Sequence, residues 1–226
     1  MAKRMKKTPR KPTVRILIVD DHPIVREGLS SLLAKEPDFE VCGEAEDIPT
    51  AIKLVDATKP HVVTIDISLK SGSGIDLIKR IAKRKQTIRM VACSLHDETL
   101  YAERALHAGA LAYVNKHEAT RTIVKAIRQV LEDKVYLSER MSEQLTHRLI
   151  GGRGQMERSA MESLSDRELE VFRMIGDGLT STEIAKKLHL GVKTVDTYRS
   201  RIKQKLKLTN MAQLSRNAAQ WALERG

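Results

Sequence analysis

The chain of 226 residues is poor in aromatic side chains, cysteine and long apolar runs. Phe, Tyr and Trp supply only 3% of it, so any core must be built from aliphatic residues, as in helical and α/β domains. No run of about 18 or more apolar residues occurs, which predicts that nothing spans a membrane. The basic start of the chain lacks the apolar stretch of a secretory signal. Cys42 and Cys93 lie in apolar segments and are interpreted as buried thiols of a cytoplasmic protein, too few for a disulfide framework or a metal site.

The net charge of +11 is unevenly distributed. Residues 1–13 hold six Lys/Arg and no acid, which predicts a disordered, solvated tail. Residues 14–134 hold 18 basic and 18 acidic residues, whereas 164–226 hold 12 basic and seven acidic. A neutral module is thus followed by a basic one, whose expected partner is an anionic polymer.

Residues 14–134 alternate short apolar runs with amphipathic stretches. Five strand–helix units in series predict an α/β domain, a doubly wound (βα)5 parallel sheet covered by helices on both faces. Ligands of such sheets gather at the carboxyl ends of the strands. The strands are expected at 14–19, 40–45, 61–65, 89–94 and 111–115.

The remaining residues predict a linker and a small all-α domain. Residues 135–163 begin with a stretch that could form a helix, but GGRGQ breaks it, so the whole segment is interpreted as a linker. Residues 164–226 carry helical patterns only, starting with a capping box of Ser165 and Glu168. Two helices there meet across a turn at 190–191, the spacing of a helix-turn-helix.

Polar side chains follow four of the five expected strands. Asp20 and Asp21 follow the first, Asp66 the third, Ser94 the fourth and Lys116 the fifth. Because parallel strands end at one edge of the sheet, three carboxylates can converge there, and they would repel one another without a cation. Carboxylate oxygens suit Mg²⁺. One carboxylate could then accept a phosphoryl group, with the metal and a Lys neutralising its oxygens.

The segments ILIVDDHPIVREGL, VVTIDISL and CSLHDE resemble receiver domains of two-component response regulators of the NarL/FixJ branch. The resemblance implies a non-enzymatic regulator whose Asp66 accepts a phosphoryl group from a histidine kinase or phosphotransfer protein. Lys70 departs from the family, which usually has Pro there, and this leaves the loop after Asp66 less rigid. The resemblance also implies Mg²⁺ bound by Asp20, Asp21, Asp66 and the Ser68 backbone carbonyl, Lys116 pairing with the phosphate, Ser94 as the switch hydroxyl, and Tyr113 as the switch aromatic that turns inward.

The second module contains a strongly basic helix. From 185 to 207 there are eight Lys/Arg and one acid, Asp196, while Val195, Ile202 and Leu206 form an apolar seam expected to pack inward. Such a helix fits the major groove of DNA, with basic side chains on phosphates and short polar groups near base edges. A membrane-surface helix would need a larger apolar face.

The segment LSDRELEVFRMIGDGLTSTEIAKKLHLGVKTVDTYRSRIKQKL resembles the LuxR-type helix-turn-helix. The resemblance implies binding of double-stranded DNA. A two-helix reader contacts few bases alone, which predicts a homodimer on a two-fold site after phosphorylation, and RNA polymerase is a further expected partner. Asp196 and Tyr198 depart from residues common in the family, which affects the base preference. The residues placed at the DNA by this resemblance are Lys193, Thr194, Thr197, Arg199, Ser200 and Lys203.

Two other functions compete with this one. In a phosphohydrolase Asp66 would be the nucleophile, but Ser68 stands where dehalogenase-like phosphatases carry a second Asp, and no GxxxxGK[ST] pattern occurs. An orphan regulator working without phosphate keeps the same residues and stays open as an alternative. Incubation with a small phosphodonor separates turnover by an enzyme from a lasting acyl phosphate on a receiver.

Overall fold

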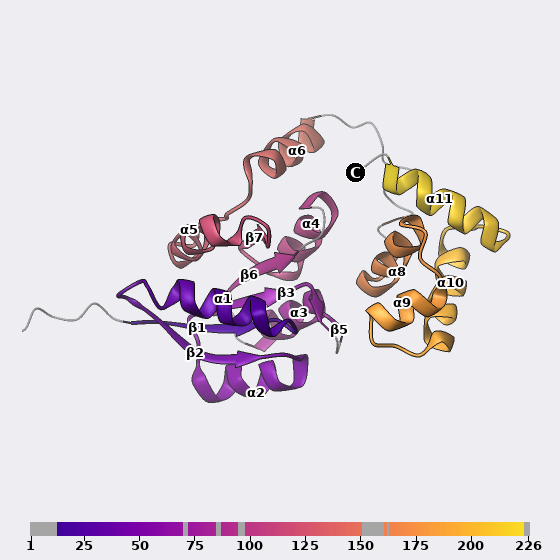
Figure 1. The fold of residues 1–226 in the computed structure, drawn as a ribbon. Coiled ribbons are helices and arrows are strands. Elements are labelled where there is room, and N and C mark those ends of the chain that lie inside the picture. Colours follow the sequence, from indigo (N-terminus) through magenta and orange to yellow (C-terminus); the bar gives the residue numbers. More distant parts are fainter. Residues whose placement is uncertain are drawn as a thin grey trace, which may run out of the picture. The chain divides into compact units, whose positions relative to one another are not determined.

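The computed structural model describes residues 13–69, 72–84, 87–94, 98–150, 161 and 163–223. It divides into two compact units at the junction of Leu145 and Thr146 (Figure 1). The predicted tail, up to residue 12, and Lys70 lie outside the described residues. In the described part of the chain, no helix is long and apolar enough to cross a membrane.

The first unit contains a five-stranded parallel sheet in the order β2-β1-β3-β6-β7. The predicted fold class is therefore confirmed. The strand order reverses between β1 and β3, and ligands of such sheets bind at this point, beyond the carboxyl ends of the strands. The strands are β1 (Val14–Val19), β2 (Phe39–Ala45), β3 (Val62–Asp66), β6 (Arg89–Ser94) and β7 (Ala112–Asn115).

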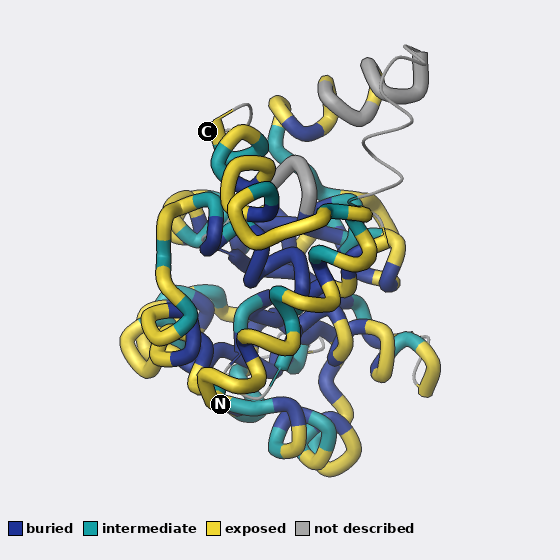
Figure 2. Tube along the Cα trace, turned by 90° about the vertical axis from the view of Figure 1, so that its right-hand side faces the viewer, coloured by how far each residue is buried: buried dark blue, intermediate teal, exposed yellow. Residues whose placement is uncertain are grey.

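Helices cover both faces of this sheet, so the central strands are buried (Figure 2). α1 and α5 pack together on one face, where Leu33 and Ile127 share a core with Ile16 and Ile18 of β1. α2 contacts α3, and α3 contacts α4. These helices are α1 (Pro23–Leu33), α2 (Ile48–Thr58), α3 (Gly74–Arg84), α4 (Glu98–Ala108) and α5 (Ala119–Leu131).

A two-stranded hairpin follows β3 directly and was not predicted. It consists of β4 (Ser68–Leu69) and β5 (Gly72–Ser73). Gly72 has a φ of 142°, which favours glycine. The hairpin returns the chain to the end of β3, where the Gly74 amide donates to the Ile67 carbonyl at 2.7 Å.

The two cysteines differ in burial. Cys93 is buried in β6, and burial raises the pKa of its thiol to about 12, so it is unreactive. Cys42 was expected to be buried too, but it is only half-buried, with its thiol donating to the Ile16 carbonyl at 3.4 Å. Both are free thiols.

The segment predicted as a linker, 135–163, starts with ordered structure. The Tyr136 amide donates to the Leu111 carbonyl at 2.9 Å, and the Tyr136 carbonyl accepts from the Tyr113 amide at 3.1 Å. These bonds extend the sheet beside β7. The helix α6 (Glu139–Ile150) then follows. The first half of the predicted linker is therefore structured, since Tyr136 pairs with the sheet edge and α6 follows it.

The second unit is helical in its described residues, as predicted. The Ser165–Glu168 capping box starts its first helix, and a second box formed by Thr180 and Glu183 starts the next. The helices enclose a core that includes Phe172, Ile184 and Leu214. They are α8 (Asp166–Gly176), α9 (Ser181–Lys187), α10 (Val192–Lys205) and α11 (Met211–Leu223).

Candidate functional site

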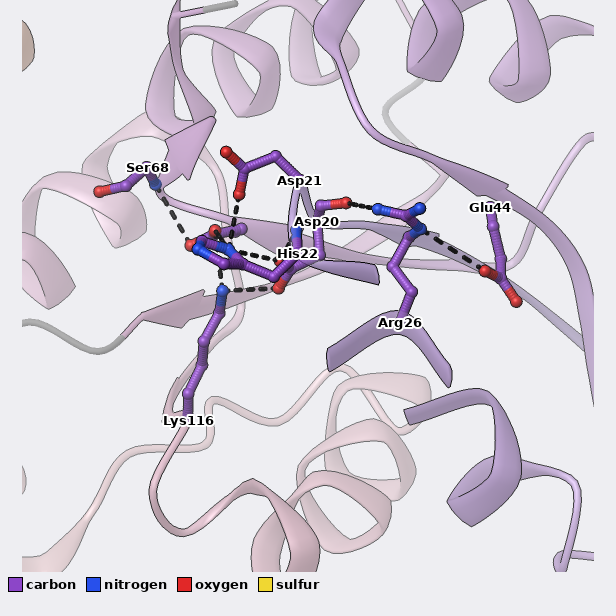
Figure 3. Close-up of polar contacts among 8 residues, drawn as sticks. Asp20, Asp21, His22, Arg26, Glu44, Ser68 and Lys116 are labelled. Atoms are coloured by element: carbon purple, nitrogen blue, oxygen red, sulfur yellow. Dashed lines mark hydrogen bonds and ion pairs between the residues drawn. The ribbon is translucent and has the colours of Figure 1, made fainter. Parts of the chain in front are cut away.

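Three carboxylates meet where β1 and β3 end (Figure 3). Asp20 and Asp21 follow β1, and Asp66 is the last residue of β3. All three are buried, and one ligand atom from each lies within 4.8 Å of the others and of His22. The convergence expected from the strand ends is present, because neighbouring parallel strands end at the same edge.

Lys116 reaches the same place from the end of β7. Its Nζ lies 2.6 Å from Asp20 Oδ2 and 2.8 Å from Asp66 Oδ2, and its side chain is 4% exposed. The Lys116 amide donates to the Ser94 carbonyl at 2.8 Å, which fixes its backbone to the end of β6. The structure therefore brings together the predicted lysine and two of the predicted carboxylates.

Burial dominates the electrostatics of this cluster. Burial, helped by the neighbouring Asp20, raises the pKa of Asp66 to about 7, while Lys116 and the Ser68 amide oppose the rise. Burial disfavours the charge on Lys116 as well, but Asp66 and Asp20 outweigh it and raise the pKa of that ammonium. One lysine thus faces three buried carboxylates, and a further cation would relieve their repulsion.

The residues fit a divalent cation such as Mg²⁺. Carboxylate oxygens are the ligands that hard cations prefer, and Asp20, Asp21 and Asp66 offer them within one small volume. The Ser68 amide donates to Asp66 Oδ1 at 3.2 Å and so orients this carboxylate.

Two further residues adjoin this cluster, His22 and Arg26. From the sequence, a surface or capping role is expected for His22 rather than an acid–base role, and its side chain is 58% exposed, yet its Nδ1 lies 2.7 Å from Asp21 Oδ1 and 3.3 Å from Asp20 Oδ1. Arg26 donates to the Asp20 carbonyl at 2.6 Å, and its Nε lies 3.6 Å from Glu44 (Figure 3). The position of His22 directly after two aspartates was a signal for its place at the site.

The two predicted switch residues are both inside the domain. Ser94 is the last residue of β6 and is fully buried. Tyr113 on β7 is 2% exposed, so its side chain is already inward in this structure. A switch through Tyr113 would therefore repack a buried ring and would not transfer an exposed one.

In the second unit, α10 has the predicted division between buried and exposed faces. Val195 and Ile202 are fully buried, and Leu206 just after the helix is partly buried. The six residues predicted to contact DNA lie outside this seam. Lys193, Thr194, Thr197 and Ser200 are exposed, while Arg199 and Lys203 are half-buried.

Some polar groups of α10 are engaged within the domain. Lys205 Nζ lies 2.6 Å from Glu168 Oε2 and donates to the Ser163 carbonyl at 2.9 Å. The Thr197 hydroxyl donates to the Lys193 carbonyl at 2.9 Å. Thr197 can therefore offer DNA its methyl group and an acceptor oxygen, but its proton is already bonded.

Comparison with known families places both units. The response regulator receiver domain matches residues 16–128, and the LuxR family of bacterial regulatory proteins matches residues 162–218. The chain is a response regulator. Its receiver domain is followed by a LuxR-type DNA-binding domain, so it is a transcription regulator and not an enzyme.

Two bacterial regulators are similar to this response regulator over nearly their whole length. The response regulator GacA of Pseudomonas aeruginosa is 33% identical over 202 residues, which are 89% of this chain and 94% of GacA. The putative positive transcription regulator BvgA of Bordetella pertussis is 30% identical over 200 residues, covering 88% of this chain and 94% of BvgA.

Solved structures are similar as well. The complex of the response regulator RcsB with DNA has a TM-score of 0.56 at 27% identity, covering 92% of this chain and 98% of RcsB. RcsB of Salmonella enterica serovar Typhimurium, bound to a promoter in the presence of the phosphomimetic BeF₃⁻, has a TM-score of 0.61 at 27% identity, covering 92% of this chain and 99% of RcsB.

Proposed function

We propose that phosphorylation of Asp66 by a histidine kinase or phosphotransfer protein controls DNA binding by this response regulator. The observation that carries the proposal is the bridge of Lys116 between Asp66 and Asp20 at the carboxyl edge of the sheet. A buried lysine beside an acceptor carboxylate can neutralise a transferred phosphoryl group as its charge develops.

The transfer itself is a displacement at phosphorus. An Asp66 carboxylate oxygen bonds to phosphorus, the P–N bond to the donor histidine breaks, and the imidazole leaves with the electron pair. Asp20, Asp21, Asp66 and the Ser68 carbonyl would hold Mg²⁺, which supplies charge neutralisation when bound. Lys116 pairs with the phosphoryl oxygens of the acyl phosphate.

The response would pass from Ser94 and Tyr113 to the DNA-binding domain. The phosphoryl group adds about −1.5 to −2 charges, and the Ser94 hydroxyl can donate to it. Because the Tyr113 amide is bonded to Tyr136, a shift of β7 reaches the segment that leads into α6. We propose that this repacking releases the DNA-binding domain and promotes a homodimer on DNA, with 14–134 as the receiver domain and 164–226 as the reader.

Double-stranded DNA is the proposed ligand of α10. The RcsB–DNA complex supports this assignment by similarity, and the exposed polar residues of α10 supply donors and acceptors for the major groove. RNA polymerase is a further proposed partner, at promoters where the dimer binds. The proposed DNA contacts are Lys193, Thr194, Thr197, Arg199, Ser200 and Lys203.

Labelling with a small phosphodonor in the presence of Mg²⁺ tests the acceptor. Asp66→Asn should abolish labelling, whereas Asp76→Asn, a change of the same kind at an exposed residue of α3, should label like the parent chain. Full labelling of Asp66→Asn would refute the assignment.

Sedimentation and DNA footprinting with beryllofluoride test the output. The mimic should convert the chain from monomer to dimer and tighten promoter binding. A chain that stays monomeric and protects DNA equally well with and without the mimic would instead be an orphan regulator.

A further inference from the structure

Three polar side chains join the start of α9 to α10. The Ser181 hydroxyl donates to Asp196 Oδ1 at 2.8 Å, and Arg199 Nη1 donates to Ser181 Oγ at 3.1 Å. Ser181 is the first residue of α9, and Asp196 and Arg199 lie three residues apart on α10. These three residues are called the Ser181 relay below.

The relay has a defined direction. A serine hydroxyl has one proton and two lone pairs. Because the Ser181 hydroxyl donates its proton in a hydrogen bond to Asp196, the lone pairs of its oxygen are left to accept from Arg199. One of the five N–H groups of the guanidinium is thus bonded to Ser181, and this bond fixes the orientation of the other four relative to α10.

The negative charge of Asp196 is unfavourable for a helix that is proposed to bind DNA. Asp196 is an exposed acid on α10, so it repels phosphates and lowers general affinity. An arginine that contacts only phosphates can do so in many side-chain conformations, so holding it in one conformation would add little affinity. A base edge, in contrast, must be met at a defined position and angle, and arginine meets guanine O6 and N7 with two parallel donors.

We propose that Ser181 and Asp196 position Arg199 to read one guanine in the major groove, which makes both residues determinants of sequence preference. The inference rests on the proposed binding of DNA by α10, and it moves Arg199 from general phosphate contact to base recognition. Ser181 and Asp196 are positioning residues, and Arg199 alone meets the base.

The test uses the full chain with beryllofluoride and Mg²⁺. A random duplex library gives the preferred sequence of the parent chain, and affinities are then measured for that duplex and for a scrambled duplex of equal composition. Ser181→Ala should lower the ratio of the two affinities roughly tenfold, the effect of losing one hydrogen bond to a charged group. The loss should fall on one base position. Ser181→Thr keeps the hydroxyl and should keep the ratio, and Ser215→Ala on the exposed face of α11 is a matched control.

Asp196→Ala gives a second signature. It removes both the acceptor of the relay and a negative charge, so preference should fall while binding of the scrambled duplex tightens roughly twofold. A general disturbance of the domain would weaken both duplexes. Folding is controlled independently, because Thr180 and not Ser181 caps α9, and Trp221 fluorescence reports unfolding of this unit.

Two results would overturn the inference. One is an unchanged preference in Ser181→Ala. The other is an equal loss of affinity for both duplexes, which would mean that Arg199 contacts phosphates and not a base. A parent chain that binds both duplexes equally would overturn the inference alone, whereas a parent chain that binds neither would overturn the proposed DNA-binding function as well.

Discussion

Gly74 is the residue at which the fold constrains the acceptor site most tightly. It begins α3, and a Cβ placed there would lie 1.9 Å from the carbonyl oxygen of Asp66 and 2.8 Å from its carbonyl carbon. Both contacts are with backbone, so no side chain can rotate away. In Gly74→Ala, either the end of β3 or the start of α3 must move.

The loss of folding stability in Gly74→Ala can be compared with the effect of a control substitution in the same domain. Overpacking of this kind costs about 1–3 kcal/mol, and the atoms displaced belong to the acceptor itself. A Cβ added to Gly28, within α1, would meet nothing within 4 Å. Gly28→Ala should therefore stabilise the receiver domain by about 0.5–1 kcal/mol, the usual gain from replacing glycine inside a helix.

Urea unfolding followed by far-UV circular dichroism measures both effects, with Trp221 fluorescence reporting the second unit separately. Phosphodonor labelling measures the acceptor, and Gly74→Ala should label more slowly because the Asp66 backbone has shifted. Equal stability and equal labelling of Gly74→Ala and the parent chain would refute the reasoning, since they would mean that β3 and α3 separate at no cost.

Two further predictions follow from the ion pairs of Glu168 and Asp66. Lys205→Ala should destabilise the second unit by about 1 kcal/mol, because it leaves the buried Glu168 without a cation but Lys205 itself is 38% exposed and screened by water. It should leave the salt dependence of DNA binding unchanged, whereas Lys203→Ala should reduce that slope by about one. Although burial opposes it, Lys205 lowers the pKa of Glu168, so the stabilisation should be present at neutral pH and lost as the pH falls through the range of that carboxyl. Because the pKa of Asp66 is raised to about 7, Mg²⁺ affinity measured by calorimetry should increase from about pH 6 to about pH 8, and Asp66→Asn should flatten this rise. A flattened salt slope in Lys205→Ala, or a pH-independent affinity, would contradict these expectations.

The acceptor site was predictable because its members occupy strand ends. Asp20, Asp66 and Lys116 follow apolar runs long enough to be recognised as strands, and parallel topology places such positions on one edge. The helix α10 was predictable for a similar reason, since its buried seam repeats with the helical period. Where a regular pattern extends over a whole element, the sequence determines which face a residue occupies.

The features that were missed involve too few residues to form a pattern. The hairpin of β4 and β5 has two residues per strand, and the pairing of Tyr136 with the sheet edge is a single bridge. The approach of His22 to Asp21 depends on the turn into α1. The Ser181 relay depends on the side-chain conformations of residues on two different helices, and the hydrophobic period of a helix does not predict these conformations.

The count of basic residues also overstates the charge that α10 offers to DNA. Lys205 is paired with the carboxylate of Glu168, which neutralises its charge within the domain. The same distinction holds in the receiver domain, where Lys116 is enclosed by carboxylates and adds nothing to the surface charge. In both domains a lysine pairs with a buried carboxylate, as predicted for Lys116 and not for Lys205. The affinity for DNA should therefore depend on cations that face the solvent, such as Lys193 and Lys203. The sequence preference should depend on Arg199, which Ser181 holds in place.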